Sequence, residues 1–240
     1  MNKHTYEQFG RDLDALRQGV LLMGQKVCQQ VREAIRGLLE ADTPLIEQVI
    51  LFDKSINRKE VALDESCIQI IVRHGPAASD LRMLTTTMQM ITDLERVGDE
   101  AKKIAKAARQ IIAASTPESI PSVNLQPVAN HVVSMLERAL DAYLRSDVAA
   151  APQLAREDKD GDAIVKSITL ELATQMKRSP DVVLRSIDFL TIARSIERIG
   201  DHATNVAEYV VFMAKGYDVR HASIKTMERI AATGEHPDTP

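Results

Sequence analysis

The chain has 240 residues, of which 45% are hydrophobic and 27% are charged, and its formal net charge at pH 7 is −4. This balance excludes a disordered or fibrous chain, and because neither half is basic it argues against nucleic acid as a partner. Only four tyrosines and four phenylalanines are present, with 10 glycines, 9 prolines and no tryptophan. Sheet-rich folds need more ring residues and more turns, so the composition predicts long helices.

Three segments of the first half carry helix signals. Apolar residues recur every three or four positions over residues 13–38, which predicts one amphipathic helix. A second helix starts at the Asp-Thr-Pro sequence of residues 42–44 and stops at the His-Gly-Pro sequence of residues 74–76. Ser-Asp at residues 79–80 begins a third, which we expect to reach about residue 115.

The second half repeats this order after a break. Residues 115–127 contain three prolines and no helical period, which predicts a linker between two bundles. Apolar spacing over residues 128–143 predicts a fourth helix, and a fifth starts within residues 146–152. The Ser-Pro-Asp sequence of residues 179–181 separates the fifth from a sixth, which Gly216 ends.

The third and sixth helices are internal repeats at a constant offset of 102 residues. In both, apolar residues are spaced alternately by four and three positions, the pattern of a buried seam in a helical bundle. The matched sets are Met90, Leu94, Val97, Ala101, Ile104, Ala108 and Ile111, and Ile192, Ile196, Ile199, Ala203, Val206, Val210 and Met213. The sequence therefore predicts an all-α fold of six long helices, a tandem repeat of two three-helix bundles. We expect residues 1–118 to form the first bundle and residues 119–240 the second.

Within this repeat, the pentad Glu-Arg-Val-Gly-Asp at residues 95–99 recurs as Glu-Arg-Ile-Gly-Asp at residues 197–201. Its Glu and Asp lie one helical turn apart, at the flank of the apolar seam, where two like charges repel. Its glycine costs about 1 kcal/mol relative to alanine in a helix interior. Because both costs occur twice, a positive charge close to each pentad is expected.

The preceding helix of each half supplies a second polar pair, within residues 53–57 and within residues 158–162. If adjacent helices align these pairs with the pentads, each bundle presents four oxygen-bearing side chains in one patch. Hard cations such as Mg²⁺, Ca²⁺, Mn²⁺ and ferric iron prefer oxygen ligands. A metal-binding patch in each bundle is therefore one hypothesis.

A structural ion-pair network is the alternative, because Arg96 and Arg198 lie inside the pentads and Lys102, Lys103 and Lys106 follow the first. His202 is either an additional ligand or a surface residue with its own partner. The sequence contains no P-loop, no nucleophile elbow and no His-Glu-x-x-His motif. No glutamate is followed three residues later by histidine, which argues against a ferritin-like di-iron oxidase.

Two tandem three-helix units carrying Asp-Leu-Glu-Arg-Val-Gly-Asp-Glu-Ala and Ser-Ile-Glu-Arg-Ile-Gly-Asp-His-Ala resemble the PhoU family of phosphate uptake regulators. The resemblance covers nearly the whole chain. It implies a cytoplasmic, homodimeric protein that is not an enzyme and that negatively regulates phosphate uptake and the phosphate-starvation response. The implied partners are the phosphate ABC transporter, through its ATPase subunit, and a phosphate-responsive sensor histidine kinase. The protein would then contact a membrane only through these partners.

The resemblance also implies metal ions on paired E(D)xxxD motifs, one pair per bundle, with iron, manganese, magnesium, calcium or zinc as candidates. Carried over by position, the ligands are Asp53, Asn57, Glu95 and Asp99 in the first bundle and Asp158, Asp162, Glu197 and Asp201 in the second. Asn57 replaces a carboxylate of its motif, and Lys103 stands where the second repeat has Asn205. We therefore expect weaker metal binding in the first bundle.

The two cysteines, Cys28 and Cys67, show neither a CxxC pair nor metal-ligand spacing and are predicted to be buried free thiols. The longest unbroken apolar stretch, residues 209–214, is far shorter than the ~18 residues of a membrane span. Two other functions remain open. A metal-dependent hydrolase would use the carboxylate clusters to activate water. A metal-free helical scaffold would not need them.

Overall fold

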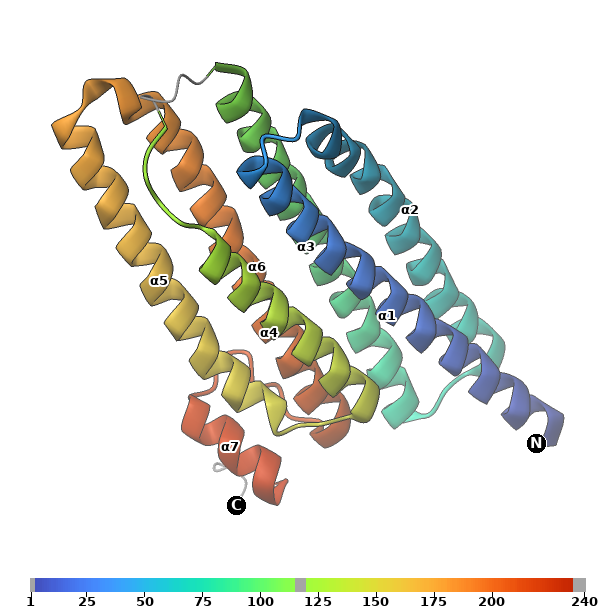
Figure 1. Ribbon diagram of the computed structural model, residues 1–240. Helices are drawn as coiled ribbons and strands as arrows, with labels where there is room; N and C mark the ends of the chain where they lie inside the picture. Colours follow the sequence, from blue (N-terminus) through green and yellow to red (C-terminus); the bar gives the residue numbers. More distant parts are fainter. Residues whose placement is uncertain (1–2, 115–119, 235–240) are drawn as a thin grey trace.

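The computed structural model describes residues 3–114 and 120–234, and within them it contains helices and no strand. The first bundle consists of α1 (Lys3–Leu39), α2 (Thr43–His74) and α3 (Ala78–Ala114), and the second of α4 (Gln126–Arg145), α5 (Ala150–Arg178) and α6 (Val183–Lys215) (Figure 1). The predicted all-α fold of six long helices in two three-helix bundles is confirmed. The expected domain boundary at residues 118–119 lies outside the described residues and stays a prediction.

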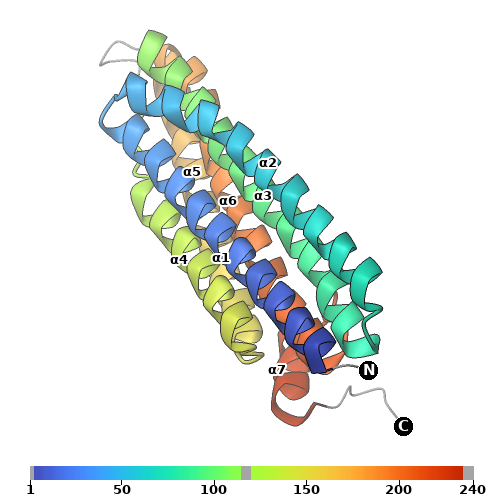
Figure 2. The same ribbon diagram turned by 90° about the vertical axis from the view of Figure 1, so that its right-hand side faces the viewer.

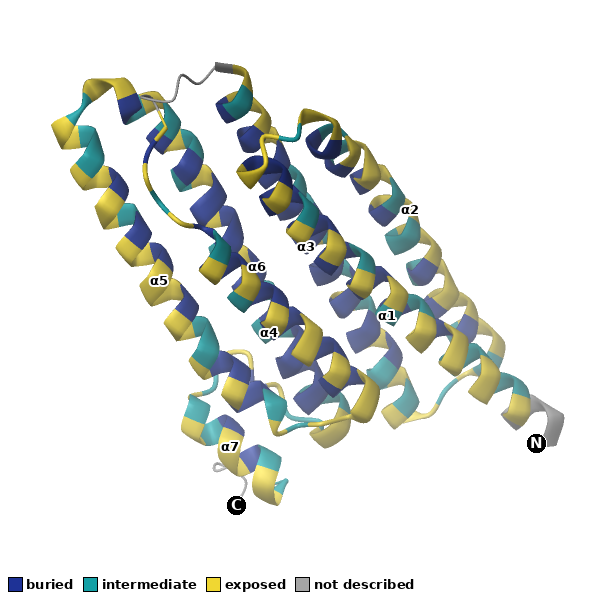
Figure 3. Cartoon of the chain, in the orientation of Figure 1, coloured by how far each residue is buried: buried dark blue, intermediate teal, exposed yellow. Residues whose placement is uncertain are grey.

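Helices α3 and α6 form the centre of the molecule, where they pack against each other (Figure 2). Helix α1 packs against α4 across the two bundles, while α2 and α5 lie at the outer edges (Figure 1). Each long helix turns a buried stripe inward and an exposed stripe outward (Figure 3). Every residue of the two predicted seams is buried except Met213, which is partly buried.

The two cysteines are part of the buried core. Cys28 and Cys67 are buried and unpaired, and burial raises the pKa of each thiol to about 12. The prediction of buried free thiols is therefore confirmed. No helix within residues 3–114 or 120–234 combines the length and the apolar character that crossing a bilayer requires.

At each end of the central helix pair, one arginine connects α3 and α6 by hydrogen bonds. Near the start of α3, Arg82 donates two hydrogen bonds to the Met213 carbonyl of α6, at 3.3 and 3.2 Å. Near the start of α6, Arg185 donates one to the Gln110 carbonyl of α3, at 2.8 Å. Arg82 thereby satisfies a carbonyl that the last turn of α6 leaves without an intrahelical partner. The repeat seen in the sequence is thus also an approximate two-fold arrangement of contacts.

Most predicted helix ends are confirmed with small shifts, but α1 begins at Lys3, ten residues before the apolar stripe that predicted it. The Asp42 side chain accepts a hydrogen bond from the Leu45 N–H at 2.9 Å and caps α2. Gly75 and Gly216 end α2 and α6 in the left-handed region, at φ 52° and 80°. The sixth helix follows a short 3₁₀ turn, η2 (Pro180–Val182), because the proline favours a tight first turn.

A seventh helix, α7 (Ile224–Thr233), was not predicted from the sequence. Ser223 caps it by accepting a hydrogen bond from the Thr226 N–H at 3.2 Å. Its two fully buried residues, Met227 and Ile230, face α5 and α6. Its larger apolar residues, Ile224, Met227 and Ile230, span only seven residues, too short a stretch to establish a helical period from the sequence.

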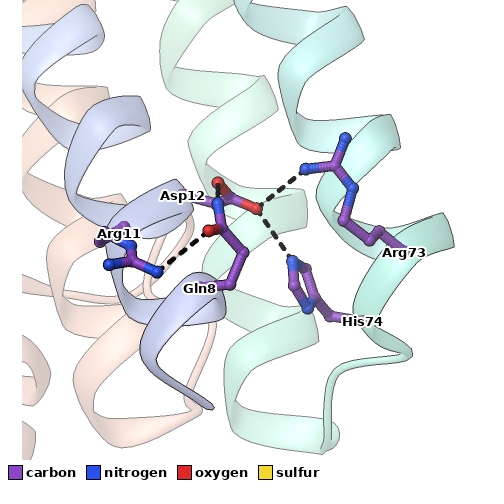
Figure 4. Close-up of polar contacts among 5 residues, drawn as sticks. All are labelled: Gln8, Arg11, Asp12, Arg73 and His74. Carbon is purple, nitrogen blue, oxygen red and sulfur yellow. Dashed lines mark hydrogen bonds and ion pairs between the residues drawn. The ribbon is translucent and has the colours of Figure 1, made fainter. Parts of the chain in front are cut away.

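The N-terminal half of α1 is tied to the end of α2 by a polar cluster around Asp12 (Figure 4). One Asp12 carboxylate oxygen accepts a hydrogen bond from Gln8 at 2.6 Å. The other lies 2.9 Å from His74 Nε2 and 3.2 Å from Arg73. The Phe9 ring packs on the His74 ring at 5.1 Å between centroids. This cluster fixes the direction of α1 relative to the bundle.

Candidate functional site

The second bundle brings its four predicted carboxylates together, with Asp158 and Asp162 on α5 facing Glu197 and Asp201 on α6. Burial raises the pKa of Asp158 to about 7, and the charges of Asp201, Asp162 and Glu197 add to the effect. The pKa values of Asp162 and Asp201 are also raised, first by burial and then by neighbouring carboxylates of the same set. Such shifts mean that the charges of Asp158, Asp162 and Asp201 are poorly compensated. Glu197, by contrast, pairs with Arg194 at 2.9 Å.

The pentad glycine of the second bundle permits this approach of the two helices. A Cβ atom at Gly200 would lie 2.7 Å from Asp158 Oδ1, closer than such atoms pack. At the matched glycine of the first bundle, Gly98, the nearest atom would be a methyl carbon of Ile56 at 3.3 Å. The glycine therefore makes room for a carboxylate in one bundle and for ordinary packing in the other.

The first bundle also gathers carboxylates, but it contains a cation of its own. Asp53 is buried, and the Lys102 ammonium lies 2.6 Å from its Oδ2 atom and 3.5 Å from Asp99 Oδ1. Burial raises the pKa of Glu95, and the charges of Asp99 and other acids raise it further. Asn57 is exposed, one turn along α2 from Asp53.

Two acids of the first cluster were missed from the sequence. Glu60 is close enough to raise the pKa of Glu95, and burial together with Asp64 and Asp99 raises the pKa of Glu60 itself. The spacing of Asp53, Asn57, Glu60 and Asp64 is four, three and four residues, which is one helix face. This continued spacing along one face of α2 could have identified Glu60 and Asp64 as members of the cluster.

The alternative hypothesis expected the pentad arginines to form structural ion pairs. One of them does so, with an acid that is not among the predicted ligands. Arg198 contacts Glu100 at 3.3 Å, and Lys103 contacts the same carboxylate at 2.7 Å. The side chain of Glu100 is only 6% exposed, and its Oε2 atom is buried without a hydrogen-bond partner. An ion-pair network therefore exists. It joins the two bundles, and it also reaches predicted ligands, since Lys102 contacts Asp53 and Arg194 contacts Glu197 at 2.9 Å.

His202 has a partner in the first bundle. Its Nδ1 atom lies 2.7 Å from Asp93 Oδ1, and the Tyr209 hydroxyl donates to the other oxygen of the same carboxylate at 2.7 Å. Burial would raise the pKa of Asp93, but these hydrogen bonds outweigh it and the pKa is lowered. Of the two roles expected for His202, the structure supports a residue satisfied by its own partner.

A groove of about 610 Å³ lies between α3 and α6 and joins the two pentads. It is lined by acids of both bundles and by the cations that pair with them: Glu95, Arg96, Asp99, Glu100, Lys103, Arg198, Asp201 and His202. The acidic surfaces of the two bundles are therefore continuous.

The donor chemistry of the second bundle fits a hard cation, because all four side chains offer oxygen and, within the described part of the chain, only Glu197 of the four forms an ion pair, with Arg194 at 2.9 Å. Among the described residues, no three His, Cys, Asp or Glu side chains already converge on one point as metal ligands. A cation would therefore have to draw the exposed carboxylates of Asp162 and Asp201 inward. In the first bundle the Lys102 ammonium already contacts the buried carboxylate, so the residues there do not fit a metal ion equally well.

The fold and these clusters define a protein of two tandem three-helix bundles with a carboxylate patch in each. The chain matches the model of the PhoU domain twice, over residues 20–108 and 125–210. It therefore belongs to the PhoU family.

Relatives and solved structures agree with this assignment. The chain is 38% identical to the phosphate-specific transport system accessory protein PhoU homolog of Pseudomonas aeruginosa, over 95% of this chain and 94% of that protein. It is 36% identical to the phosphate-specific transport system accessory protein PhoU of Escherichia coli, over 97% and 95%. The crystal structure of PhoU from Pseudomonas aeruginosa superposes with a TM-score of 0.82 at 37% identity, covering 87% of this chain and 100% of that one. The phosphate transport system regulatory protein PhoU of Streptococcus pneumoniae gives a TM-score of 0.80 at 28% identity, covering 88% and 99%.

Proposed function

We propose that this protein is an accessory regulator of phosphate-specific transport, which keeps the phosphate-starvation response off when phosphate is plentiful. The observation that carries the proposal is the match of both three-helix units to the PhoU domain, with relatives named as accessory proteins of that transport system. In this proposal the protein acts in the cytoplasm as a homodimer. It links the ATPase subunit of the phosphate ABC transporter to a sensor histidine kinase.

The proposed mechanism is binding rather than catalysis. The continuous acidic surface along α3 and α6 would dock on a partner and stabilise one of its signalling states, since a ligand shifts an equilibrium by its differential affinity for the two states. The poorly compensated charges of Asp158, Asp162 and Asp201, together with the adjacent Glu197 carboxylate, support a divalent or ferric cation in the second bundle. Such a cation would neutralise these carboxylates and hold α5 against α6.

A reporter of the phosphate-starvation response tests this function in a host strain that lacks its own homologue, grown on ample phosphate. We expect the wild-type protein to silence the reporter. The variant with Glu95, Asp99, Glu197 and Asp201 all replaced by alanine should fold and fail to silence it. The matched control replaces Asp14, Glu40, Glu65 and Glu171, which are exposed and lie elsewhere, so that the charge change is the same.

Each outcome separates the hypotheses. A reporter that the wild-type protein leaves active contradicts the regulatory function. Silencing by the quadruple variant supports the metal-free scaffold, in which the carboxylates are not needed. A hydrolase would require turnover of a phosphorylated substrate that depends on the same four residues.

A further inference from the structure

The two carboxylate clusters differ at one position of the repeat. Lys102, in the first bundle, corresponds to Thr204 in the second at the offset of 102 residues. Lys102 contacts Asp53 at 2.6 Å and Asp99 at 3.5 Å. The hydroxyl of Thr204 is buried and has no hydrogen-bond partner. The first cluster therefore has an internal counter-charge where the second has an unsatisfied polar atom.

The surroundings of the buried Asp53 and of its partly buried counterpart Asp158 agree with this difference. The Asp53 side chain is 3% exposed, and one of its oxygens is held by the ammonium while the other is buried without a partner. Asp158, which takes the place of Asp53 in the second bundle, faces other carboxylates instead. A buried carboxylate next to an ammonium has little need of a second cation.

We propose that Lys102 is a built-in cation that occupies the carboxylate site of the first bundle, so that only the second bundle binds a divalent metal ion. This inference rests on the proposed metal binding by the second bundle. Total charge does not distinguish the two clusters, because Glu60 and Asp64 add carboxylates to the first. The distinction is positional: the ammonium is in direct contact with the one acid that is fully buried.

The substitution of Asn57 for a carboxylate fits the same arrangement. A site that already holds a single positive charge needs fewer negative charges than a site for a divalent ion. Asn57 is exposed beside Asp53, where it can add an oxygen but no charge. The missing carboxylate at position 57 and the ammonium of Lys102 therefore both make the first cluster less negative.

Titration of the full-length, metal-free protein with Mn²⁺ tests the proposal, with free Mn²⁺ followed by electron paramagnetic resonance. Wild type should bind Mn²⁺, and Asp158→Asn with Asp201→Asn should lose at least 90% of that binding. Adding Lys102→Thr to this double variant should restore Mn²⁺ binding, now in the first bundle. Lys102→Met, which keeps most of the alkyl stem, is the second variant, and Lys106→Thr, at an exposed lysine one turn further along α3, is the matched control.

Thermal unfolding gives an independent readout. In EDTA, Lys102→Thr should lower the melting temperature by several degrees, because the buried Asp53 carboxylate loses its only contact with a cation among the described residues. Mn²⁺ should reverse this loss for Lys102→Thr, whereas Lys106→Thr should unfold like wild type in both conditions.

The possible results separate the inference from the proposed function. Mn²⁺ binding that persists in Asp158→Asn with Asp201→Asn overturns the inference, because the first bundle would then take metal in the presence of Lys102. Failure of both Lys102 variants to restore binding also overturns it. Wild type that binds no Mn²⁺, combined with restoration by Lys102→Thr, supports the role of Lys102 and contradicts metal binding by the second bundle.

Discussion

The carboxylate of Asp93, on α3, is held by the imidazole of His202, on α6, at a distance of 2.7 Å between Oδ1 and Nδ1. The repeat matches Ser195 with Asp93 and His202 with Glu100, and Ser195 is among the neighbours that lower the pKa of Glu100. The interface between the bundles therefore contains two symmetry-related polar contacts inside an apolar seam. Buried contacts of this kind restrict how the two helices can align, because a shift of either helix leaves a charge without a partner.

The first prediction concerns this interface. Asp93→Asn should lower the free energy of unfolding by about 1–3 kcal/mol at pH 7, because hydrogen bonds to a buried charge are lost. Combined with His202→Ala, the two changes should cost less than their sum, with a coupling of about 1 kcal/mol. Urea denaturation of the four proteins measures both quantities. Strictly additive effects would contradict a direct Asp93–His202 interaction.

The second prediction concerns the pH dependence of the metal-free protein. The folded-state pKa of Asp158, about 7, is above its value of about 4 in an unfolded chain. The folded state therefore holds this proton more tightly, and its contribution to the free energy of unfolding falls as the pH rises from about 4 to about 7. Asn cannot titrate in this range, so Asp158→Asn removes this loss of unfolding free energy with rising pH.

In EDTA at pH 8, Asp158→Asn should consequently melt at a higher temperature than wild type, by roughly 2–6 °C. At pH 4 the difference should vanish, because Asp158 is protonated there as well. Asp160→Asn, at an exposed neighbour on α5, is the control and should show no such dependence. A variant less stable than wild type at pH 8 would mean that Asp158 is compensated after all.

The third prediction contrasts the two pentad glycines. A methyl group at Gly200 would meet Asp158 Oδ1 at 2.7 Å, and the carboxylate can rotate away at low cost. Gly200→Ala should therefore fold with nearly wild-type stability but bind Mn²⁺ at least tenfold more weakly, as a titration would show. Gly98→Ala should change Mn²⁺ affinity little, since its new methyl group meets Ile56 at 3.3 Å. Equal effects of both variants would contradict a specific role for Gly200.

The fourth prediction concerns Asp12, whose pKa is lowered chiefly by the hydrogen bond with His74 and also by Gln8 and Arg73. Stability from such a group is present above its unfolded-state pKa and is lost as the pH falls through the lowered folded-state pKa. Asp12→Asn should therefore cost about 1 kcal/mol at pH 7 and progressively less below pH 4.

Hydrogen exchange of the α1 amides, together with urea denaturation, checks the effect of Asp12→Asn. Faster exchange should be confined to the N-terminal half of α1, the part that this cluster holds against α2. Asp14→Asn, at an exposed position two residues further on, is the control. Equal exchange in both variants would show that the contact does not hold α1.

The clusters could be predicted in part. The pairing of Asp158 and Asp162 with Glu197 and Asp201 follows from two helical spacings and one assumption about alignment, and the structure brings these side chains together. The cation of the first bundle could not be predicted, because three lysines follow its pentad. Which of them reaches Asp53 depends on how α2 lies against α3. As metal ligands, all eight residues remain predictions.

By itself the sequence determined the six long helices, their two-fold repetition and the two pentads, because helical period, caps and internal offset are local properties of the chain. The tertiary structure alone decided that Lys102 neutralises Asp53, that Asp93 holds His202 and that α7 packs on α5. The hydrogen bond between Lys102 and Asp53 joins residues 49 positions apart, and the one between His202 and Asp93 joins residues 109 positions apart. Their partners are selected by the distance between packed helices, which no spacing along one helix specifies.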